Sequence, residues 1–319
     1  MNLRKVSAIA LVFGMTAGML TGCGSSYEPS ASSSGAGVAS SDSVSSASEE
    51  AGTFSESAVS ASEAGGSDVK TEIHVFIAAS LNQVMQEVAE KFNEQYPNVT
   101  VTYNADSSGK LMTQIEEGYA CDVFFSAAQK QMDQLEGEGL VVDGTRKNVV
   151  NNQVCIITRK DSGTKVTGLD TLKDAASIAL ADGSVPVGKY TREALVNSGI
   201  LAKVDDPSKI TTQEISDALG GVEISEQSNV SKVLAAVTEA SCEVGTTYYS
   251  DTYGQDDQIK IIQKIPYDLT GDVLYPIAQI RNDEADAAEQ KAAEDFTKFV
   301  TADEMKEIFQ KYYFDTAVE

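Results

Sequence analysis

Beyond residue 69, short apolar segments alternate with segments whose apolar residues recur at helical spacing. Residues 72–78 (EIHVFIA) predict a buried strand, and the next predicted helix places Leu81, Val84, Met85, Val88 and Phe92 on one face. The same pattern predicts strands at 99–103, 123–126, 154–158, 177–181, 244–248, 258–265 and 273–280. It predicts helices at 109–117, 129–136, 188–197, 229–239, 285–300 and 302–312. This alternation predicts parallel βαβ units and a doubly wound α/β fold.

Small and polar residues gather where predicted strands end and helices begin, the edge at which open α/β sheets bind ligands. The four junctions are A-A-S-L at 78–81, D-S-S-G at 106–109, V-P-V-G at 185–188 and N-V at 229–230. The first turn of a helix has N–H groups without helical partners, and the helix dipole favours negative charge there. The junctions therefore predict an oxyanion site built from neutral donors, with no Lys or Arg required.

Charge and residue usage exclude several other functions. The chain has 24 Lys and Arg against 48 Asp and Glu, a net charge of −24, which argues against nucleic acid as a partner. Its single His argues against mechanisms that need a histidine base together with a histidine ligand. The four Cys have no C-x-x-C spacing, which argues against zinc ribbons and thioredoxin-like redox sites.

The first 69 residues predict an exported, anchored chain. Arg4 and Lys5 precede an apolar run at 6–20 that is short for a membrane span and typical of a signal peptide. The run leads into L-T-G-C, which resembles the bacterial lipobox, so residues 1–22 are expected to be removed and Cys23 to be lipidated. Residues 24–67 contain 17 Ser and no Lys or Arg, so 23–69 is predicted to be a disordered linker. We expect an extracytoplasmic protein attached to the lipid bilayer through Cys23.

Four stretches of the ordered part resemble, in order, segments of one family. They are FIAASLNQVMQEVAEKF, YNADSSGKLMTQIEEGYACDVFFSAAQKQMDQLEGEGLV, LADGSVPVGKYTREAL and GTTYYSD. The chain resembles the molybdate-binding proteins, which are substrate-binding components of molybdate ABC transporters with a type II periplasmic-binding-protein fold. The resemblance implies a ligand cleft between two lobes, here 70–152 plus 252–319 and 153–251.

The resemblance also implies the ligand and the residues that bind it. Ser80 and Ser108 would give hydroxyls and amides, Val187 and Val230 backbone N–H groups, and Tyr248 its phenol. The ligand would be molybdate or tungstate, with no protein side chain coordinating the metal itself. The resemblance further implies a non-enzymatic, monomeric protein without a cofactor that delivers its ligand to a membrane permease.

A site of donors alone favours oxyanions that carry no proton. Molybdate and tungstate are fully deprotonated near neutral pH, whereas phosphate keeps a proton that needs an acceptor. Sulfate is also deprotonated, so its rejection would depend on the size of the cavity.

Other interpretations of the same residues stay open at this point. Ser80-x-x-Gln83 is also a helix-capping pattern. Gly183-x4-Gly188-Lys189 is most of a nucleotide-binding P-loop, although Tyr190 replaces its Ser or Thr.

Two further patterns suggest other chemistries. Ser107-x-x-Lys110 is similar to the acylating serine motif of penicillin-binding enzymes. The adjacent pair Tyr248-Tyr249 matches the phenolate ligands of ferric-binding proteins, which share this fold.

Overall fold

The computed structural model describes residues 70–318. The chain divides into two units, Met1–Glu63 and Ala64–Glu319, and every described residue belongs to the second unit. The predicted signal peptide at 1–22, the lipidation site Cys23 and the predicted linker at 23–69 lie outside the described residues. Within residues 70–318, no helix combines the length and the apolar character that crossing a membrane requires.

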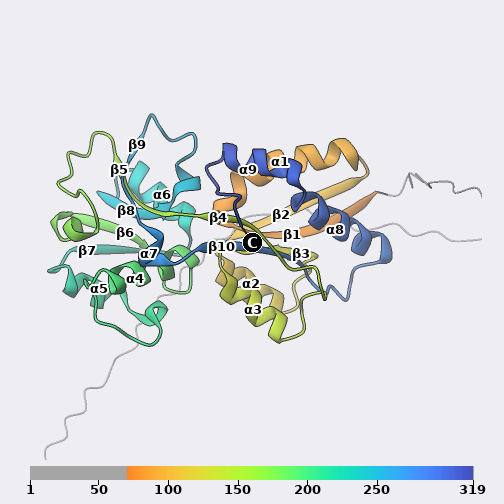
Figure 1. Cartoon of the computed structure of the whole chain (residues 1–319), viewed down its shortest axis with the longest axis horizontal. Coiled ribbons are helices and arrows are strands. Elements are labelled where there is room, and N and C mark those ends of the chain that lie inside the picture. Colours follow the sequence, from red (N-terminus) through yellow and green to blue (C-terminus); the bar gives the residue numbers. More distant parts are fainter. Residues whose placement is uncertain (1–69, 319) are drawn as a thin grey trace, which may run out of the picture. The chain divides into compact units, whose positions relative to one another are not determined.

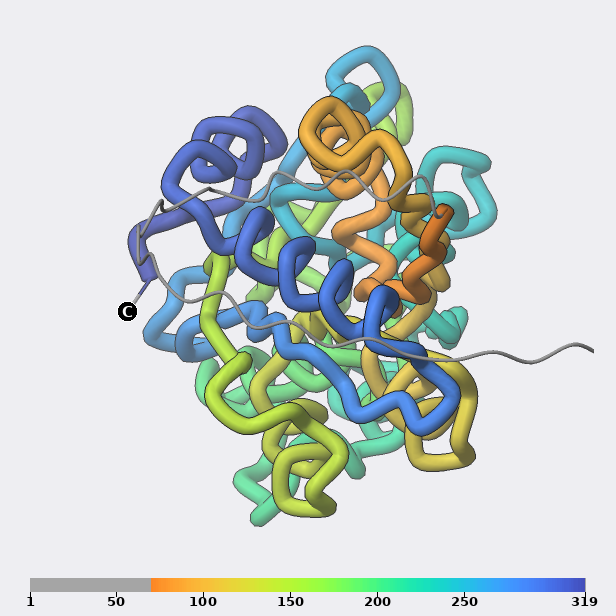
Figure 2. The backbone as a smooth tube through the Cα atoms, turned by 90° about the vertical axis from the view of Figure 1, so that its right-hand side faces the viewer, coloured from red at the N-terminus to blue at the C-terminus, as the bar shows by residue number. Residues whose placement is uncertain are grey.

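The first sheet has five strands in the order β2-β1-β3-β10-β4. β1 is parallel to β2 and β3, whereas β10 is antiparallel to β3 and β4. Figures 1 and 2 show α1, α8 and α9 over one face, and α2 and α3 over the other. We call this sheet and these helices the first lobe. Its elements are β1 (Thr71–Ala78), β2 (Val99–Asp106), β3 (Val123–Phe125), β4 (Lys147–Asn152), β10 (Val273–Gln279), α1 (Asn82–Gln95), α2 (Ser108–Glu116), α3 (Gln129–Gly137), α8 (Ala287–Val300) and α9 (Lys306–Lys311), with short 3-10 turns η1 (Ala79–Leu81) and η5 (Asp303–Met305).

The second sheet also has five strands, in the order β7-β6-β8-β5-β9. β6 is parallel to β7 and β8, and β5 is antiparallel to β8 and β9. Figure 1 shows α6 on one side of this sheet and α4, α5 and α7 on the other, and we call the group the second lobe. Its elements are β5 (Val154–Arg159), β6 (Ser177–Ala181), β7 (Glu223–Gln227), β8 (Val244–Tyr248), β9 (Ile259–Lys264), α4 (Pro186–Asn197), α5 (Thr212–Ala218), α6 (Val230–Thr238) and α7 (Tyr267–Thr270), with 3-10 turns η2 (Leu169–Asp174), η3 (Pro207–Lys209) and η4 (Tyr249–Thr252).

The chain passes from one sheet to the other in two places. The first crossing is abrupt, because β4 ends at Asn152 in the first sheet and β5 begins at Val154 in the second. The return to the first sheet occurs between Lys264 and Val273. We predicted this return at residue 252, which is too early, because β9 hydrogen-bonds to β5 in the second sheet.

Strand β1 shows why the first lobe forms two buried layers. Ile73, Val75 and Ile77 belong to one apolar cluster and Phe76 belongs to another, so side chains on both faces of the strand are buried. On the α1 side, the Phe92 ring lies edge-on to two phenylalanines of α8, at centroid distances of 5.1 Å from Phe296 and 5.4 Å from Phe299. Burying such a side chain contributes roughly 2 kcal/mol, so these contacts hold the outer helices on the sheet.

The predicted α/β architecture with two sheets is confirmed, and the strands at 177–181 and 244–248 have the predicted bounds. The sheets are mixed rather than wholly parallel, because each includes antiparallel strands. Strands β4 and β7 and helix α5 were not predicted. Their sequences, KNVVNN, EISEQ and TQEISDA, are rich in polar residues and lack a clear apolar period.

Four tyrosines join the two lobes beside the crossings. The ring of Tyr249, in η4, stacks on Tyr313, which follows α9, with centroids 4.7 Å apart and planes at 8°. Tyr253 contacts Tyr312 at 4.3 Å and Tyr313 at 5.5 Å. The ammonium of Lys264 lies 3.0 Å from the centre of the Tyr249 ring, a cation–π contact. We call Tyr249, Tyr253, Tyr312 and Tyr313 the tyrosine cluster.

Candidate functional site

A small cavity lies between the two lobes, and eleven residues line it. They are Ala78, Ala79, Ser80, Ser107, Ser108 and Ala127 from the first lobe, and Val185, Pro186, Val187, Val230 and Tyr248 from the second. None of these lining residues is charged. The space open to the centre of a water-sized sphere is ≈ 10 Å³, about what one water molecule needs. This space is smaller than a tetrahedral oxyanion, so binding such an ion would require the two walls to move apart slightly.

All five residues predicted to bind the ligand line this one cavity. Ser80 lies in the turn that leads into α1, and Ser108 is the first residue of α2. Val187 is in the first turn of α4, and Val230 is the first residue of α6. Four helix starts therefore surround the cavity, and their first-turn N–H groups have no partner within their helices. The ligand-binding role of the five residues stays a prediction.

The two serines that begin α2 have separate tasks. The hydroxyl oxygen of Ser107 caps the helix by accepting a hydrogen bond from the backbone N–H of Lys110 at 3.4 Å. The oxygen of Ser108, which is fully buried, accepts one from the N–H of Ala127 at 2.9 Å. Because the Ser108 oxygen is already an acceptor, its own proton is available to donate into the cavity.

Ser80 does not cap a helix, which excludes the capping interpretation of Ser80-x-x-Gln83. Helix α1 has no side-chain cap, and the Ser80 hydroxyl instead lies 2.8 Å from the Tyr275 hydroxyl. Tyr275 is in β10, is fully buried, and also accepts a hydrogen bond from the side-chain amide of Asn152 at 3.0 Å. Nothing in the sequence around Ser80 indicates this partner, which comes from a strand 195 residues away.

Tyr248 ends β8 with a buried hydroxyl that makes no hydrogen bond of good geometry within the described residues, although the Tyr275 hydroxyl lies near it. Burial raises the pKa of this phenol well above its usual range, so the hydroxyl keeps its proton. The backbone N–H of Tyr248 is held by the carboxylate of Asp251, at 3.0 Å. The surroundings of that carboxylate desolvate it and raise its pKa to about 6, although part of the residue reaches the surface.

Direct contacts cross the cleft beside the cavity. The side-chain amide of Asn229, which caps α6, donates to the carboxylate of Asp106 at the end of β2, at 3.1 Å. The backbone at Gly109 approaches that of Ser184 so closely that a Cβ on Gly109 would lie 2.8 Å from the Ser184 carbonyl oxygen. These contacts depend on the lobes being close together, so they are sensitive to any opening of the cleft.

The glycines of the P-loop-like segment are explained by packing. A Cβ on Gly188 would lie 2.1 Å from the carbonyl oxygen of Asp182, and one on Gly183 would lie 1.9 Å from that of Ser208. Both positions therefore require glycine because the backbones approach closely, whether or not a phosphate is bound.

The contacts of Lys110 and Tyr249 argue against the acylating-serine and ferric-binding interpretations. The Lys110 ammonium is paired with Asp106, so it is held by a carboxylate rather than by the Ser107 hydroxyl. Tyr249 does not line the cavity with Tyr248, and its ring belongs to the tyrosine cluster. No group of three or more His, Cys, Asp or Glu suited to a metal ion occurs among residues 70–318.

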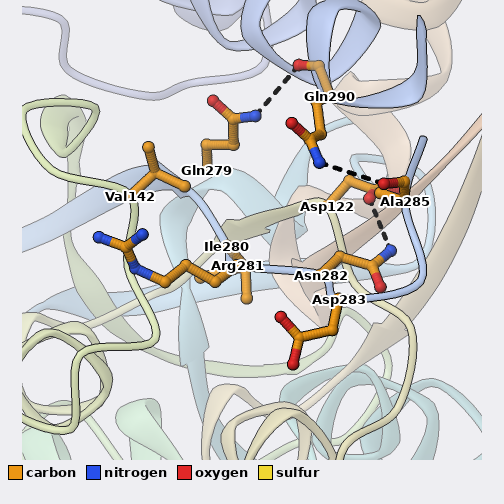
Figure 3. Close-up of a pocket in the computed structure, with 9 residues that line it drawn as sticks. All are labelled: Asp122, Val142, Gln279, Ile280, Arg281, Asn282, Asp283, Ala285 and Gln290. Carbon is orange, nitrogen blue, oxygen red and sulfur yellow. Dashed lines mark hydrogen bonds between the residues drawn. The ribbon is translucent and has the colours of Figure 1, made fainter. Parts of the chain in front are cut away.

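A larger cavity, of ≈ 290 Å³, lies entirely within the first lobe (Figure 3). Its buried carboxylate, Asp122, accepts from the side-chain amide of Asn282 at 2.8 Å and from the backbone N–H of His74 at 2.7 Å. Figure 3 shows the Arg281 guanidinium directed away from this pair. The cavity contains none of the predicted site residues, and its carboxylate already has protein partners.

Comparison with known proteins identifies the family. Residues 73–315 match the model of the family described as bacterial extracellular solute-binding protein. The chain belongs to this family. Its members bind solutes outside the cell and are not enzymes, which agrees with the predicted non-enzymatic role.

Three similar proteins extend the comparison. This solute-binding protein is 26% identical over 249 residues to YvgL of Bacillus subtilis, a candidate ABC transporter substrate-binding lipoprotein, covering 78% of this chain and 88% of that one. It is 29% identical over 250 residues to the molybdate-binding protein ModA of Haemophilus influenzae, covering 76% and 89%. Among solved structures, it is similar to the substrate-binding domain of a candidate molybdenum ABC transporter from Clostridium difficile. The TM-score is 0.56 and the identity 32%, with 78% of this chain and 100% of that chain covered.

Proposed function

We propose that this solute-binding protein binds molybdate or tungstate in the cavity between its lobes and delivers the ion to the permease of an ABC transporter. The names of its relatives in Haemophilus influenzae and Clostridium difficile support molybdenum as the element. The proposed ligand groups are the hydroxyls of Ser80, Ser108 and Tyr248 and the backbone N–H groups of Val187 and Val230, all in residues that line the cavity.

The observation that carries the proposal is the Tyr248 hydroxyl. It is buried in a cavity wall, keeps its proton and has no acceptor among the described residues. A buried donor without a partner costs roughly 1–3 kcal/mol, a cost that a bound oxyanion would remove by accepting its proton. The surrounding helix starts add partial positive charge without a cation.

The proposed selectivity follows from the same groups. The lining side chains include no carboxylate or imidazole that could accept a proton from the ligand. A hydrogen phosphate ion would bring a buried hydroxyl donor without an acceptor, and its binding would be weakened accordingly. Molybdate and tungstate have only acceptor oxygens at neutral pH and leave no such group.

Anchoring through Cys23 is part of the proposal. The similarity to YvgL, described as a candidate lipoprotein, supports the lipobox interpretation of L-T-G-C. A chain with Cys23→Ala is expected to lose incorporation of a labelled fatty acid in a bacterial host. Equal incorporation in both chains would contradict the anchor and leave the ligand proposal intact.

Isothermal titration of the purified full chain tests the ligand directly. Molybdate and tungstate are expected to bind with similar affinity, and phosphate to bind at least 100-fold more weakly. Sulfate, smaller but also deprotonated, measures how far cavity size contributes to selectivity. Absence of heat with both molybdate and tungstate would contradict the proposed function.

A further inference from the structure

Asn152, at the crossing between the sheets, has a side-chain amide whose orientation its partners fix. Its oxygen accepts from two backbone N–H groups, those of Gln153 at 2.9 Å and Ser250 at 3.4 Å. Its nitrogen therefore faces the Ser250 hydroxyl at 2.8 Å and the Tyr275 hydroxyl at 3.0 Å. A backbone N–H can only donate. Flipping the amide would therefore place the Asn152 side-chain NH₂ against the two backbone N–H groups, with no acceptor between them.

The amide orientation determines the direction of the next hydrogen bond. The Tyr275 oxygen accepts from Asn152, and the Ser80 hydroxyl oxygen lies 2.8 Å from it. The Tyr248 hydroxyl is also near Tyr275, but it makes no hydrogen bond with good geometry and so does not compete as an acceptor. Burial raises the pKa of Tyr275 well above its usual range, so the phenol retains its proton. The phenol then donates this proton to Ser80, since Asn152 offers it no acceptor.

We propose that Tyr275 is a positioning residue that makes the Ser80 hydroxyl a donor toward the ligand, through the relay Asn152 to Tyr275 to Ser80. The inference rests on the proposed oxyanion function. Tyr275 is not among the residues that line the cavity, so it acts through Ser80. With its oxygen occupied by the Tyr275 proton, Ser80 directs its own proton into the cavity.

The relay makes the Ser80 hydroxyl a hydrogen-bond donor toward the cavity, as the Ser108 hydroxyl already is. The oxygen of Ser108 accepts from the N–H of Ala127 at 2.9 Å, a donor whose direction cannot change. A serine hydroxyl on its own can donate or accept, and could therefore hold a protonated oxyanion as well. Fixing both hydroxyls as donors removes that possibility, so we assign to Tyr275 a part in rejecting hydrogen phosphate.

The rings around Tyr275 allow the hydroxyl to be tested separately from the ring. Tyr275 packs against Phe125, Tyr248 and Phe314, with centroid distances of 6.5, 5.9 and 5.6 Å. Tyr275→Phe keeps these contacts and removes only the relay. Tyr103→Phe is the matched control, because it removes a phenol that donates to the Met85 carbonyl at 2.9 Å and does not line the cavity.

The experiment is a double-mutant cycle measured by titration of the full chain with molybdate and with phosphate. Tyr275→Phe is expected to weaken molybdate binding about tenfold and to narrow the preference for molybdate over phosphate, whereas Tyr103→Phe leaves both unchanged. In a chain that already has Ser80→Ala, Tyr275→Phe is expected to have no further effect. A purely structural role of the phenol would reduce affinity equally in both backgrounds.

Asn152→Asp gives a second test if Tyr275→Phe does not fold. The new carboxylate accepts the Tyr275 proton, so Ser80 loses its donor, and the loss of affinity is expected to be larger with Ser80 present than with Ser80→Ala. Additive effects in either cycle, or unchanged binding by Tyr275→Phe, overturn the relay alone. A wild-type chain that binds neither molybdate nor tungstate overturns the proposed function, and the relay with it.

Discussion

On the first-lobe wall of the cavity, the hydroxyls of Ser80 and Ser108 each have a protein partner behind them, whereas on the second-lobe wall the Tyr248 hydroxyl has none. The first wall is thus oriented before a ligand arrives, and the second wall holds a donor that only a ligand can satisfy. Truncating a group on the first wall leaves its partner unsatisfied, while truncating Tyr248 removes an unsatisfied group. Removing a hydroxyl from the first wall should therefore lower the free energy of unfolding, and removing the Tyr248 hydroxyl should raise it. Both changes should weaken ligand binding.

Removing both serine hydroxyls tests the first wall and has the largest expected effect. Ser80→Ala with Ser108→Ala deletes two hydrogen bonds to a charged ligand, each worth about 1.5–3 kcal/mol, so molybdate affinity is expected to fall roughly 1,000-fold. Titration calorimetry measures the molybdate affinity of the double variant and of wild type. Ser216→Ala, which loses a serine bond to the Val222 carbonyl away from the cavity, is the control. Wild-type affinity in the double variant would disprove the site assignment.

Tyr248→Phe tests the second wall. Molybdate affinity is expected to fall about 30-fold, because one hydrogen bond to a charged acceptor is lost. The ligand-free chain is expected to gain about 1 kcal/mol in free energy of unfolding, since a buried hydroxyl without a partner disappears. Urea unfolding followed by circular dichroism measures this gain. Tyr103→Phe should lose stability and keep affinity, and a Tyr248→Phe chain that loses stability would remove the distinction between the walls.

Gly109→Ala tests how closely the walls must approach. The added Cβ would meet the Ser184 carbonyl oxygen at 2.8 Å, so closure is hindered and affinity is expected to fall about tenfold. The alanine itself favours helix, so α2 should not be weakened. Gly137→Ala in α3, where nothing lies within 4 Å, is the matched control. Equal affinities of the two variants would show that this approach is not needed for binding.

Asp251 behind the second wall makes stability depend on pH, with the smallest expected effect. Its pKa is raised to about 6 from an ordinary 3.8, so between these values the folded state binds more protons than the unfolded state. The contribution of this group to stability therefore falls as pH rises from about 4 to about 6, by about 1 kcal/mol after allowing for its partial exposure. Relative to wild type, Asp251→Asn should gain stability over that range. A constant difference from pH 4 to pH 7 would contradict the shift.

The sequence alone allowed the fold and the five cavity residues to be predicted, but not the groups that support them. Ser80 and Tyr248 lie next to recognisable strand ends and helix starts, so local pattern and family resemblance locate them. Tyr275 and Asn152 act through partners distant in the chain, and no local pattern indicates that a phenol in β10 meets a serine after β1. The polar strand β4, which ends at Asn152, escaped prediction because its apolar residues follow no strand period.

Glycines illustrate the same limit. The sequence Gly183 to Lys189 was open to a phosphate-binding interpretation, and only the distances to Asp182 and Ser208 show that backbone packing requires the glycines. Gly109 in D-S-S-G was expected simply to begin a helix. Its close approach to Ser184 depends on the placement of the other lobe, which local sequence does not encode.

The tyrosine cluster gives this protein a built-in optical reporter. The chain has no Trp, so its intrinsic emission comes from tyrosine alone. The stacked pair Tyr249 and Tyr313 joins η4 of one lobe to the end of α9 of the other, and any rotation between the lobes changes the overlap of these rings. Domain motion can therefore be followed by unlabelled tyrosine fluorescence, to which Tyr248 and Tyr275 also contribute because their rings meet across the lobes at 5.9 Å.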